Sequence, residues 1–183
     1  MSEQDPGISP AELFLKAPQE ADREPFLAAM RASVTYHHPW MSGWTSDSAY
    51  DRYLLRAEDE RQDLNLLCRH SDGAIVGFFN VSEIVYGALR SAYLGYGGVA
   101  EYRGQGYMSV GMQLLLERAF TILGLHRIEA NIQPRNTASR ALAARSGFVR
   151  EGFSEAYLLI DGQWRDHERW AIRAEQWREF RGG

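Results

Sequence analysis

The spacing of apolar residues divides the chain into alternating helical and extended segments. Residues 13–17, LFLKA, read as extended chain. Apolar residues at helical spacing predict a helix within residues 19–33 and a second over residues 47–63. Between these helices, the Pro, Gly and Ser content of residues 37–46 predicts a loop.

Three strands are predicted next, because residues 64–70, 74–86 and 90–100 are rich in Val, Ile, Tyr and Phe and bounded by Gly and Asp. Their short connections predict antiparallel neighbours. A helix over residues 106–123 follows, with Gly124 as its stop signal. The apolar positions on one face of this helix are Met108, Met112, Leu115, Ala119 and Ile122.

The last third of the chain continues with a strand over residues 127–132 and a helix over residues 136–146. Alternation of strand and helix here indicates a crossover unit. Asp161-Gly162 lies between two strand-like segments and predicts a hairpin, and residues 174–180 predict a terminal helix. The predicted fold class is α+β, with a central mixed sheet.

Composition fits one globular domain and excludes several classes of protein. The 183 residues are 45% hydrophobic and carry a net charge of -4, so we expect a tail over residues 1–10 and one domain over residues 11–183. No apolar run or basic leader marks a membrane span or export, and we expect a cytoplasmic protein without direct nucleic-acid binding. Cys68, the single cysteine, is expected in the core.

Residues 97–112, GGVAEYRGQGYMSVGM, place a Gly-rich loop between a strand and a helix. Gly104 and Gly106 allow close approach of the backbone, the amides at the start of the helix lack partners, and Arg103 adds positive charge. These features suit a pyrophosphate. On glycine spacing alone a plain tight turn remains the preferred reading, because neither a Walker A motif nor a dinucleotide fingerprint is present.

The motif RGQGYM at residues 103–108 is similar to the Q/R-x-x-G-x-G/A signature of the Gcn5-related N-acetyltransferases (GNAT), which bind acetyl-CoA. Residues 129–153 resemble the second half of that fold. Met108 and the segment YLLIDGQWRDH, residues 157–167, resemble the RimJ/RimL branch, the ribosomal-protein alanine N-acetyltransferases. The resemblance implies a twisted, mostly antiparallel sheet flanked by helices, whose strands splay around the cofactor.

Cofactor contacts implied by the resemblance fall on the loop and on the two strands beside it. The expected holders of the pyrophosphate are the backbone amides of Arg103, Gly104, Gln105, Gly106, Tyr107 and Met108, with the hydroxyl of Ser109. Val99 is expected to pair with the pantetheine amide, and Asn131 to border the same gap. Asn136 is expected to bind the cofactor arm while it caps the following helix.

The sequence departs from the wider superfamily at Ala143, where many members carry a tyrosine that protonates the leaving thiolate. The resemblance implies Ser139 as the donor, although a serine in a first helical turn is also a common local hydrogen-bonder. Glu83 is the best carboxylate candidate for a general base, against a plain surface role. We also expect Tyr93 and Tyr96 to line the acceptor site, with core packing as the alternative.

Histidines and tryptophans add one candidate region. The five histidines show no metal-ligand spacing with one another or with Cys68, so no bound metal is expected. Trp40 and Trp44 lie in the loop over residues 37–46, which faces the acceptor in this superfamily. They are candidates for substrate recognition or for anchoring the loop on the sheet.

The resemblance implies transfer of an acetyl group from acetyl-CoA to a primary amine by direct attack in a ternary complex. The N-terminal α-amine of a protein is the leading acceptor, because an α-amine needs a weaker base than lysine does. A small amine such as a polyamine, an amino-acid derivative or an antibiotic stays open. A non-catalytic CoA-binding module and a homodimer through the terminal hairpin also stay open.

Overall fold

A seven-stranded sheet runs through the chain, in the order β1-β2-β3-β4-β5-β7-β6. This computed structural model describes residues 8–182. The strands are β1 (Leu13–Lys16), β2 (Asp63–Arg69), β3 (Ile75–Val85), β4 (Ser91–Gly98), β5 (Arg127–Ile132), β6 (Val149–Ile160) and β7 (Gln163–Arg173). Strands β4 and β5 form a parallel pair, and the other five pairings of the sheet are antiparallel. The predicted mixed, mostly antiparallel sheet is therefore confirmed.

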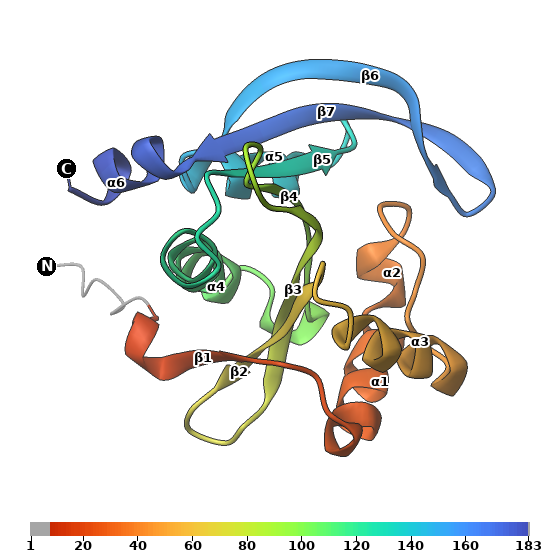
Figure 1. Ribbon diagram of the computed structural model, residues 1–183. Helices are drawn as coiled ribbons and strands as arrows, with labels where there is room; N and C mark the ends of the chain where they lie inside the picture. The colour runs from red at the N-terminus through yellow and green to blue at the C-terminus, as the bar shows by residue number, and fades with distance from the viewer. Residues whose placement is uncertain (1–7, 183) are drawn as a thin grey trace, which may run out of the picture.

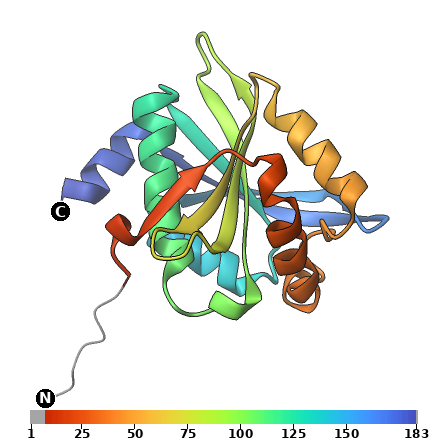
Figure 2. The same ribbon diagram turned by 90° about the horizontal axis from the view of Figure 1, so that it is seen from below.

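Six α-helices accompany the sheet. They are α1 (Arg23–Ala32), α2 (Val34–His37), α3 (Asp47–Ala57), α4 (Tyr107–Glu117), α5 (Thr137–Arg145) and α6 (Ala174–Gly182). Figures 1 and 2 show α4 on one side of the sheet, with α1, α2 and α3 on the other. The short helix α2 was not expected, because its residues follow α1 directly and end where the predicted loop begins. No helix of residues 8–182 is long and apolar enough to cross a membrane.

The alternation of side chains along β3 supplies one large residue to each face of the sheet. Phe79 is fully buried in a core that includes α4, whereas Phe78 belongs to a second core with α1 and α3. In that second core, the rings of Phe26 and Tyr53 stack with centroids 5.5 Å apart. Cys68 is buried there as predicted, and burial raises its pKa to about 11.

The helix predicted over residues 106–123 changes its geometry before it ends. Regular α4 stops at Glu117, and residues Arg118–Ile122 form a π-helical turn. Met112 and Ala119 are buried, but Ile122 is 69% exposed. The wider π turn rotates the last residues away from the sheet, so the prediction that Ile122 belongs to the apolar face is wrong.

The start of the chain is ordered earlier than predicted. Residues 1–7 of the expected tail lie outside the described residues. Ile8 packs against the main core, and Ser9 caps a 3₁₀ turn over Pro10–Glu12. The side chain of Ser9 accepts a hydrogen bond from the amide of Ala11, and Glu12 bonds back to the amide of Ser9. This capping box fixes residues 8–10, which we had assigned to the tail.

The hairpin of β6 and β7 curves over the sheet as a long arch (Figure 1). Its turn is formed by Asp161 and Gly162, both at positive φ, as the Asp-Gly signal predicted. Strand β7 pairs with β5 along six residues, while β6 lies outermost. Near the tip, the hydroxyl of Ser42 donates a 2.8 Å hydrogen bond to Asp161. The hairpin and the α2–α3 loop are thereby joined across the sheet.

Candidate functional site

Strands β4 and β5 separate after three paired residues, which opens a gap in the sheet. Pairing covers Ser91 to Tyr93 on β4 and Arg127 to Glu129 on β5. The remaining residues of β4 stay paired with β3 but not with β5. The predicted splay of these strands is therefore confirmed, and one edge of β4 is free for another extended chain.

The main-chain groups on that free edge belong to alternate residues of β4. In an antiparallel pair, each residue turns its N–H and C=O either toward its partner strand or away from it. The amide of Val99 donates to Val76 on β3 at 2.9 Å, so Tyr96 and Gly98 turn theirs toward the gap. The amide of Val99, which we had expected to meet pantetheine, is already used. Val99 still belongs to the lining of the cavity described below.

The Gly-rich loop forms the start of α4 as predicted. Gly104 and Gly106 have φ values of 78° and 89°, and Gly106 is the N-cap residue of the helix. A residue with a Cβ is strained in this left-handed region, which is why glycine is suited to both positions. The amide of Arg103 donates to the carbonyl of Ala100 at 3.2 Å, so it is not available to a ligand as expected.

Five consecutive amides at the helix start have no acceptor within the described residues. They belong to Gly104, Gln105, Gly106, Tyr107 and Met108. The side chain of Gln105 turns back to the carbonyl of Glu101 at 3.2 Å. A helix N-terminus with free amides attracts an anion, because the partial positive charge of the helix dipole adds to the hydrogen bonds. The loop thus has the geometry of a pyrophosphate site.

A cavity of about 440 Å³ joins this loop to the gap between the strands. Its lining comes from the loop, from the end of β4, from α2 and from α5. Among the expected cofactor residues it includes Val99, Arg103, Gly104, Gly106, Tyr107, Met108, Ser109 and Asn136. Arg145, at the end of α5, also lines it. Sequence reasoning missed Arg145, because its approach to the loop depends on how α5 packs beside α4.

Asn136 and Ser139 meet at the first turn of α5. The side-chain oxygen of Asn136 accepts a hydrogen bond from the amide of Ser139 at 3.1 Å, which is the predicted cap. The hydroxyl of Ser139 lies 2.7 Å from the hydroxyl of Tyr96 on β4. The hydroxyl of Tyr96 also lies 3.2 Å from the carbonyl oxygen of Ser139, which is an alternative acceptor for its single hydrogen. Burial raises the pKa of Tyr96 to about 12, so its phenol keeps its proton at neutral pH.

Helix α5 has alanine at position 143, so the tyrosine hydroxyl that meets Ser139 comes from β4. Ala143 is fully buried in the main core, so a tyrosine at this position would need a different packing of the helix. A tyrosine hydroxyl does reach the same region, but it comes from the neighbouring strand. This contact joins residues 43 positions apart and was not visible in the sequence.

A second cavity of about 300 Å³ lies beyond Tyr96 and shares part of its lining with the first. The residues common to both are Trp40, Met41, Tyr96, Asn136 and Ser139. Trp40 is held in place because Gln133 donates to its carbonyl at 3.0 Å. Trp44 lines the second cavity and packs on Phe78 with ring centroids 5.2 Å apart. The packing of Trp44 on Phe78 supports the expected anchoring role of this loop, and both tryptophans also line a cavity.

Asn131 belongs to the second cavity and not to the first. Its side-chain oxygen is buried and has no hydrogen-bond partner among the described residues. Because an unpaired buried carbonyl is unfavourable, this atom is suited to accept a hydrogen bond from a bound molecule. Asn131, which we expect to border the gap beside the cofactor, therefore borders the second cavity instead.

The charge of the second cavity is unusual for an amine site. No aspartate or glutamate is among the described residues that line either cavity, whereas Arg56 lines the second. Two histidines take part: His37 lines the first cavity and His167 the second. Both are buried, and burial lowers the pKa of each below the ordinary value for histidine.

Glu83 lies outside both cavities. A bulge between Ser82 and Val85 places Glu83 at φ 51°, with its side chain exposed. Ser82 lines the second cavity, and the next residue of a strand does not share its face. The prediction of Glu83 as the base in the site is therefore wrong.

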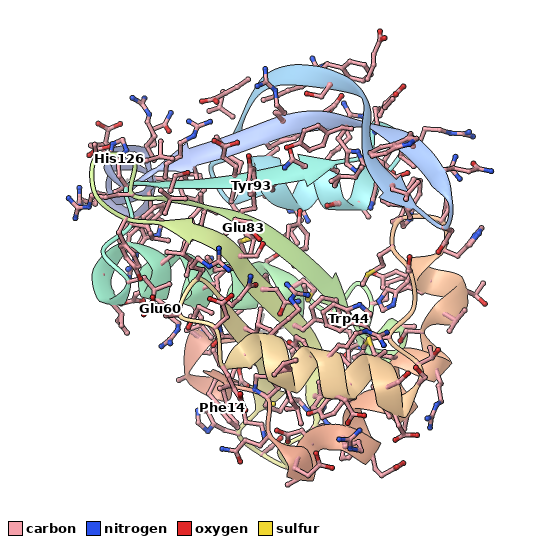
Figure 3. All side chains as sticks on the ribbon, turned by 45° about the vertical axis from the view of Figure 1, so that its right-hand side comes forward. Phe14, Trp44, Glu60, Glu83, Tyr93 and His126 are labelled. Atoms are coloured by element: carbon pink, nitrogen blue, oxygen red, sulfur yellow. The ribbon has the colours of Figure 1, made fainter. Side chains whose placement is uncertain are left out.

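Tyr93 is also placed away from the cavities. Residues three apart in a strand point to opposite faces, so Tyr93 and Tyr96 could not line one face together. Tyr93 is 40% exposed, and its interaction with Tyr157 of the arch raises its pKa. Figure 3 shows Tyr93 near Glu83, apart from the loop that carries Trp44. Of the two tyrosines expected beside the acceptor site, only Tyr96 lines a cavity within the described residues.

Comparison with known proteins identifies the family of this chain and several relatives. A family model described as an acetyltransferase (GNAT) domain matches residues 12–149. The structure of Mycobacterium smegmatis RimJ in complex with CoA-disulfide is 32% identical and superposes with a TM-score of 0.83. That comparison covers 91% of this chain and 85% of the other.

Two curated relatives differ in their acceptors. The ribosomal protein uS5-alanine N-acetyltransferase of Escherichia coli is 40% identical over 103 residues, which cover 56% of this chain and 53% of the relative. The chain thus matches about half the length of that relative. The spermidine N(1)-acetyltransferase of Vibrio cholerae is 25% identical over 140 residues, 76% of this chain and 78% of that protein.

Proposed function

Because the chain belongs to the GNAT acetyltransferase family and is an N-acetyltransferase, we propose that it transfers the acetyl group of acetyl-CoA to the N-terminal α-amine of a protein. One observation carries the choice of acceptor. The second cavity, which lies beyond the thioester position, has no carboxylate among its described lining residues and includes Arg56.

The first cavity fits the coenzyme. The free amides from Gly104 to Met108 suit the pyrophosphate, and the guanidinium groups of Arg103 and Arg145 add positive charge beside it. The free edge of β4, at Tyr96 and at the amide of Gly98, suits the pantetheine amides, which then complete the sheet as an extra strand would. Bound there, acetyl-CoA supplies an activated thioester.

Ser139 is the proposed donor of a proton to the leaving sulfur. It lies where both cavities meet, and its hydroxyl contacts that of Tyr96 at 2.7 Å. Tyr96 keeps its own proton at neutral pH and can pass one to Ser139. Asn136 holds the first turn of α5 and so fixes the position of Ser139. Preorganised groups of this kind account for much of the rate of acyl transfer.

An α-amine suits the charge of the second cavity better than a polyamine or a lysine does. The pKa of an α-amine is about 8, against about 10.4 for lysine, so roughly a tenth of it is already neutral at pH 7. A polyamine carries several positive charges, which need carboxylates for binding. The cavity offers the arginine Arg56 and neutral amides such as Asn131.

Similarity to the E. coli uS5-alanine enzyme supports a protein acceptor. The match to the Vibrio cholerae spermidine enzyme extends over more of the chain, although at 25% identity. Spermidine is therefore the second candidate. The charge of the cavity is the observation against it.

The test compares acceptors that offer different amines. Release of free CoA thiol from acetyl-CoA is measured with three groups of acceptors. The first group is short peptides that begin with Ala, Ser or Met, the second is the same peptides with a blocked α-amine and one internal Lys, and the third is spermidine. We expect turnover with the free α-amine peptides and little with the blocked ones. Turnover with spermidine alone would refute the proposed acceptor.

We also propose that residues 8–182 act as one domain and that the protein acts in the cytoplasm. The first proposal is supported by the single sheet, whose strands come from both halves of the chain. The second is supported by the substrates proposed, since acetyl-CoA and new protein N-termini are found together there. Location by fractionation of cells tests the second.

A further inference from the structure

Transfer to an amine requires a group that takes a proton from nitrogen, and no carboxylate is among the described residues that line either cavity. The nitrogen of an ammonium ion has no lone pair with which to attack, so the proton must leave first. Arg56 stays cationic, and Tyr96 keeps its proton. Among the described residues of the second cavity, His167 is the side chain that is basic near neutral pH. A role for His167 as base rests on the proposed function of that cavity as the acceptor site.

His167 is held rigidly in the wall of the cavity. It lies on β7 opposite Ser154 of β6, and its side chain is 2% exposed. The ring of Tyr157 packs against it with centroids 5.9 Å apart. Neighbours on both strands of the arch therefore fix its position, as a group that receives a proton at a defined point requires.

The hydrogen bond made by His167 fixes which of its nitrogens is free. Nδ1 lies 2.9 Å from the carbonyl oxygen of Arg165. A carbonyl accepts and does not donate, so Nδ1 carries the hydrogen. In the neutral ring Nε2 then holds the lone pair, and it has no partner among the described residues. This is the tautomer that a base needs.

The surroundings of His167 favour the neutral ring. Burial lowers its pKa, and the hydrogen bond to Arg165 and the charge of Asp166 oppose this only in part. The other titratable groups around it are Tyr157 on β6, Arg56 on α3 and Tyr96 on β4. Arg56 is a permanent cation and so cannot serve as the base itself.

His37 shares several of these properties but occupies the other cavity. Its Nε2 donates to the carbonyl of Gly98 at 2.8 Å, on the free edge of β4. It lines the first cavity and not the second. This contact fixes the end of β4 beside the coenzyme, so His37 serves the cofactor side of the site.

We propose that His167 is the general base, and that its Nε2 takes one proton from the acceptor ammonium. The freed lone pair of nitrogen attacks the thioester carbon, and the C–S bond breaks as the C–N bond forms. Nε2 releases this first proton to solvent, takes the second proton from nitrogen as the amide forms, and releases that one to solvent as well. The sulfur receives one proton from Ser139, Ser139 regains it from Tyr96, and Tyr96 regains it from solvent. The net products are the acetylated amine, free CoA thiol and one proton released to solvent.

His167→Gln tests this role, because glutamine keeps much of the volume and has no basic nitrogen. The control is His126→Gln, which changes an exposed histidine before β5, far from Trp44 and the acceptor cavity (Figure 3). We expect kcat/KM of His167→Gln to fall by about 100-fold or more. Acetyl-CoA affinity should stay unchanged. A loss within about threefold of the control, or an equal loss of acetyl-CoA affinity, would overturn the proposal.

The pH profile distinguishes a base from a packing residue. A peptide hydrazide with a blocked N-terminus is the chosen acceptor. Its nitrogen is unprotonated throughout the assay range, so Nε2 has only the proton lost after attack to take, and any acidic limb belongs to the enzyme. The profile of the wild type should fall on the acidic side, below the ordinary pKa of histidine, and the profile of His167→Gln should be flat there. Added imidazole should partly restore the activity of His167→Ala. The same acidic limb in both proteins would refute the assignment.

Two further measurements keep the test decisive. Nitrogen NMR of histidine-labelled wild type reports the tautomer without any substitution, and a hydrogen on Nε2 of His167 would overturn the proposal even if the variants fail to fold. If the wild type acetylates only spermidine, the proposed α-amine acceptor fails. The same His167 experiments then proceed with spermidine, and their outcome is separate.

Discussion

Substitution of Tyr96 by phenylalanine removes one hydroxyl from the junction of the two cavities. That hydroxyl lies 2.7 Å from the hydroxyl of Ser139 and 3.2 Å from its carbonyl oxygen. The ring remains, so packing against Phe79, whose ring centroid is 6.0 Å away, is kept. The variant therefore tests whether Tyr96 acts through Ser139.

The magnitude follows from the contact. Interactions between residues that share a hydrogen bond are coupled by about 0.5–3 kcal/mol, which corresponds to roughly 2-fold to 150-fold in rate. We expect Tyr96→Phe to lower kcat by about tenfold. Ser139→Ala should lower it by about 100-fold or more, because the proton donor itself is lost. The double variant should match Ser139→Ala within about twofold.

The assay is release of CoA thiol at saturating acetyl-CoA, with calorimetric affinity for acetyl-CoA measured on each variant. That affinity should stay constant, because Tyr96 uses its hydroxyl on Ser139. Burial raises the pKa of Tyr96 to about 12, so the ratio of wild-type to Tyr96→Phe rates should not change between neutral and mildly alkaline pH. Additive losses in the double variant would refute action through Ser139. Full activity of Ser139→Ala would remove both residues from the mechanism.

Three other changes test the loop, the core and the buried histidines. Gly106→Glu should abolish acetyl-CoA binding, measured by calorimetry, because it places a carboxylate against the pyrophosphate. Gly87→Glu is the control for backbone strain and should bind acetyl-CoA normally, since Gly87 also has a positive φ and open space around its Cβ position. Gly111→Ala should destabilise the protein by about 1–3 kcal/mol in denaturant unfolding, since the added Cβ would meet a leucine and a phenylalanine of the sheet at 2.6 Å, and unchanged stability would contradict the packing. Acidification below the ordinary histidine pKa should lower Tm. The pKa values of His37 and His167 are lowered in the fold, so the unfolded chain binds protons that the folded chain does not bind. The double variant His37→Gln/His167→Gln should lose much of this dependence of Tm on pH.

Local patterns predicted most of the elements and one half of the site. The Asp161-Gly162 turn, the Gly104 and Gly106 loop and the cap by Asn136 depend on residues close together in the chain, and all three are present. These features are decided by backbone φ values and by hydrogen bonds over a few residues. The cofactor side of the site, built on such a loop, was accordingly predictable.

Two predictions, for Ile122 and Glu83, were wrong because of local backbone geometry that the pattern of apolar and polar residues does not reveal. The π-helical turn that exposes Ile122 and the bulge that turns out Glu83 each shift the register by one residue. A single extra residue changes which face every later side chain occupies. The apolar or polar character of the residue does not reveal such a shift.

The sequence by itself determined the elements, the fold class and the anion-binding loop, because each follows from neighbours along the chain. Only the tertiary structure decided the acceptor side. There Trp40, Tyr96, Ser139 and His167 come from a loop, two strands and a helix that lie far apart in the sequence. Their meeting depends on the splay of β4 from β5 and on the insertion of β7 between β5 and β6. Those arrangements arise from packing of the whole sheet, and so no segment of the sequence encodes them alone.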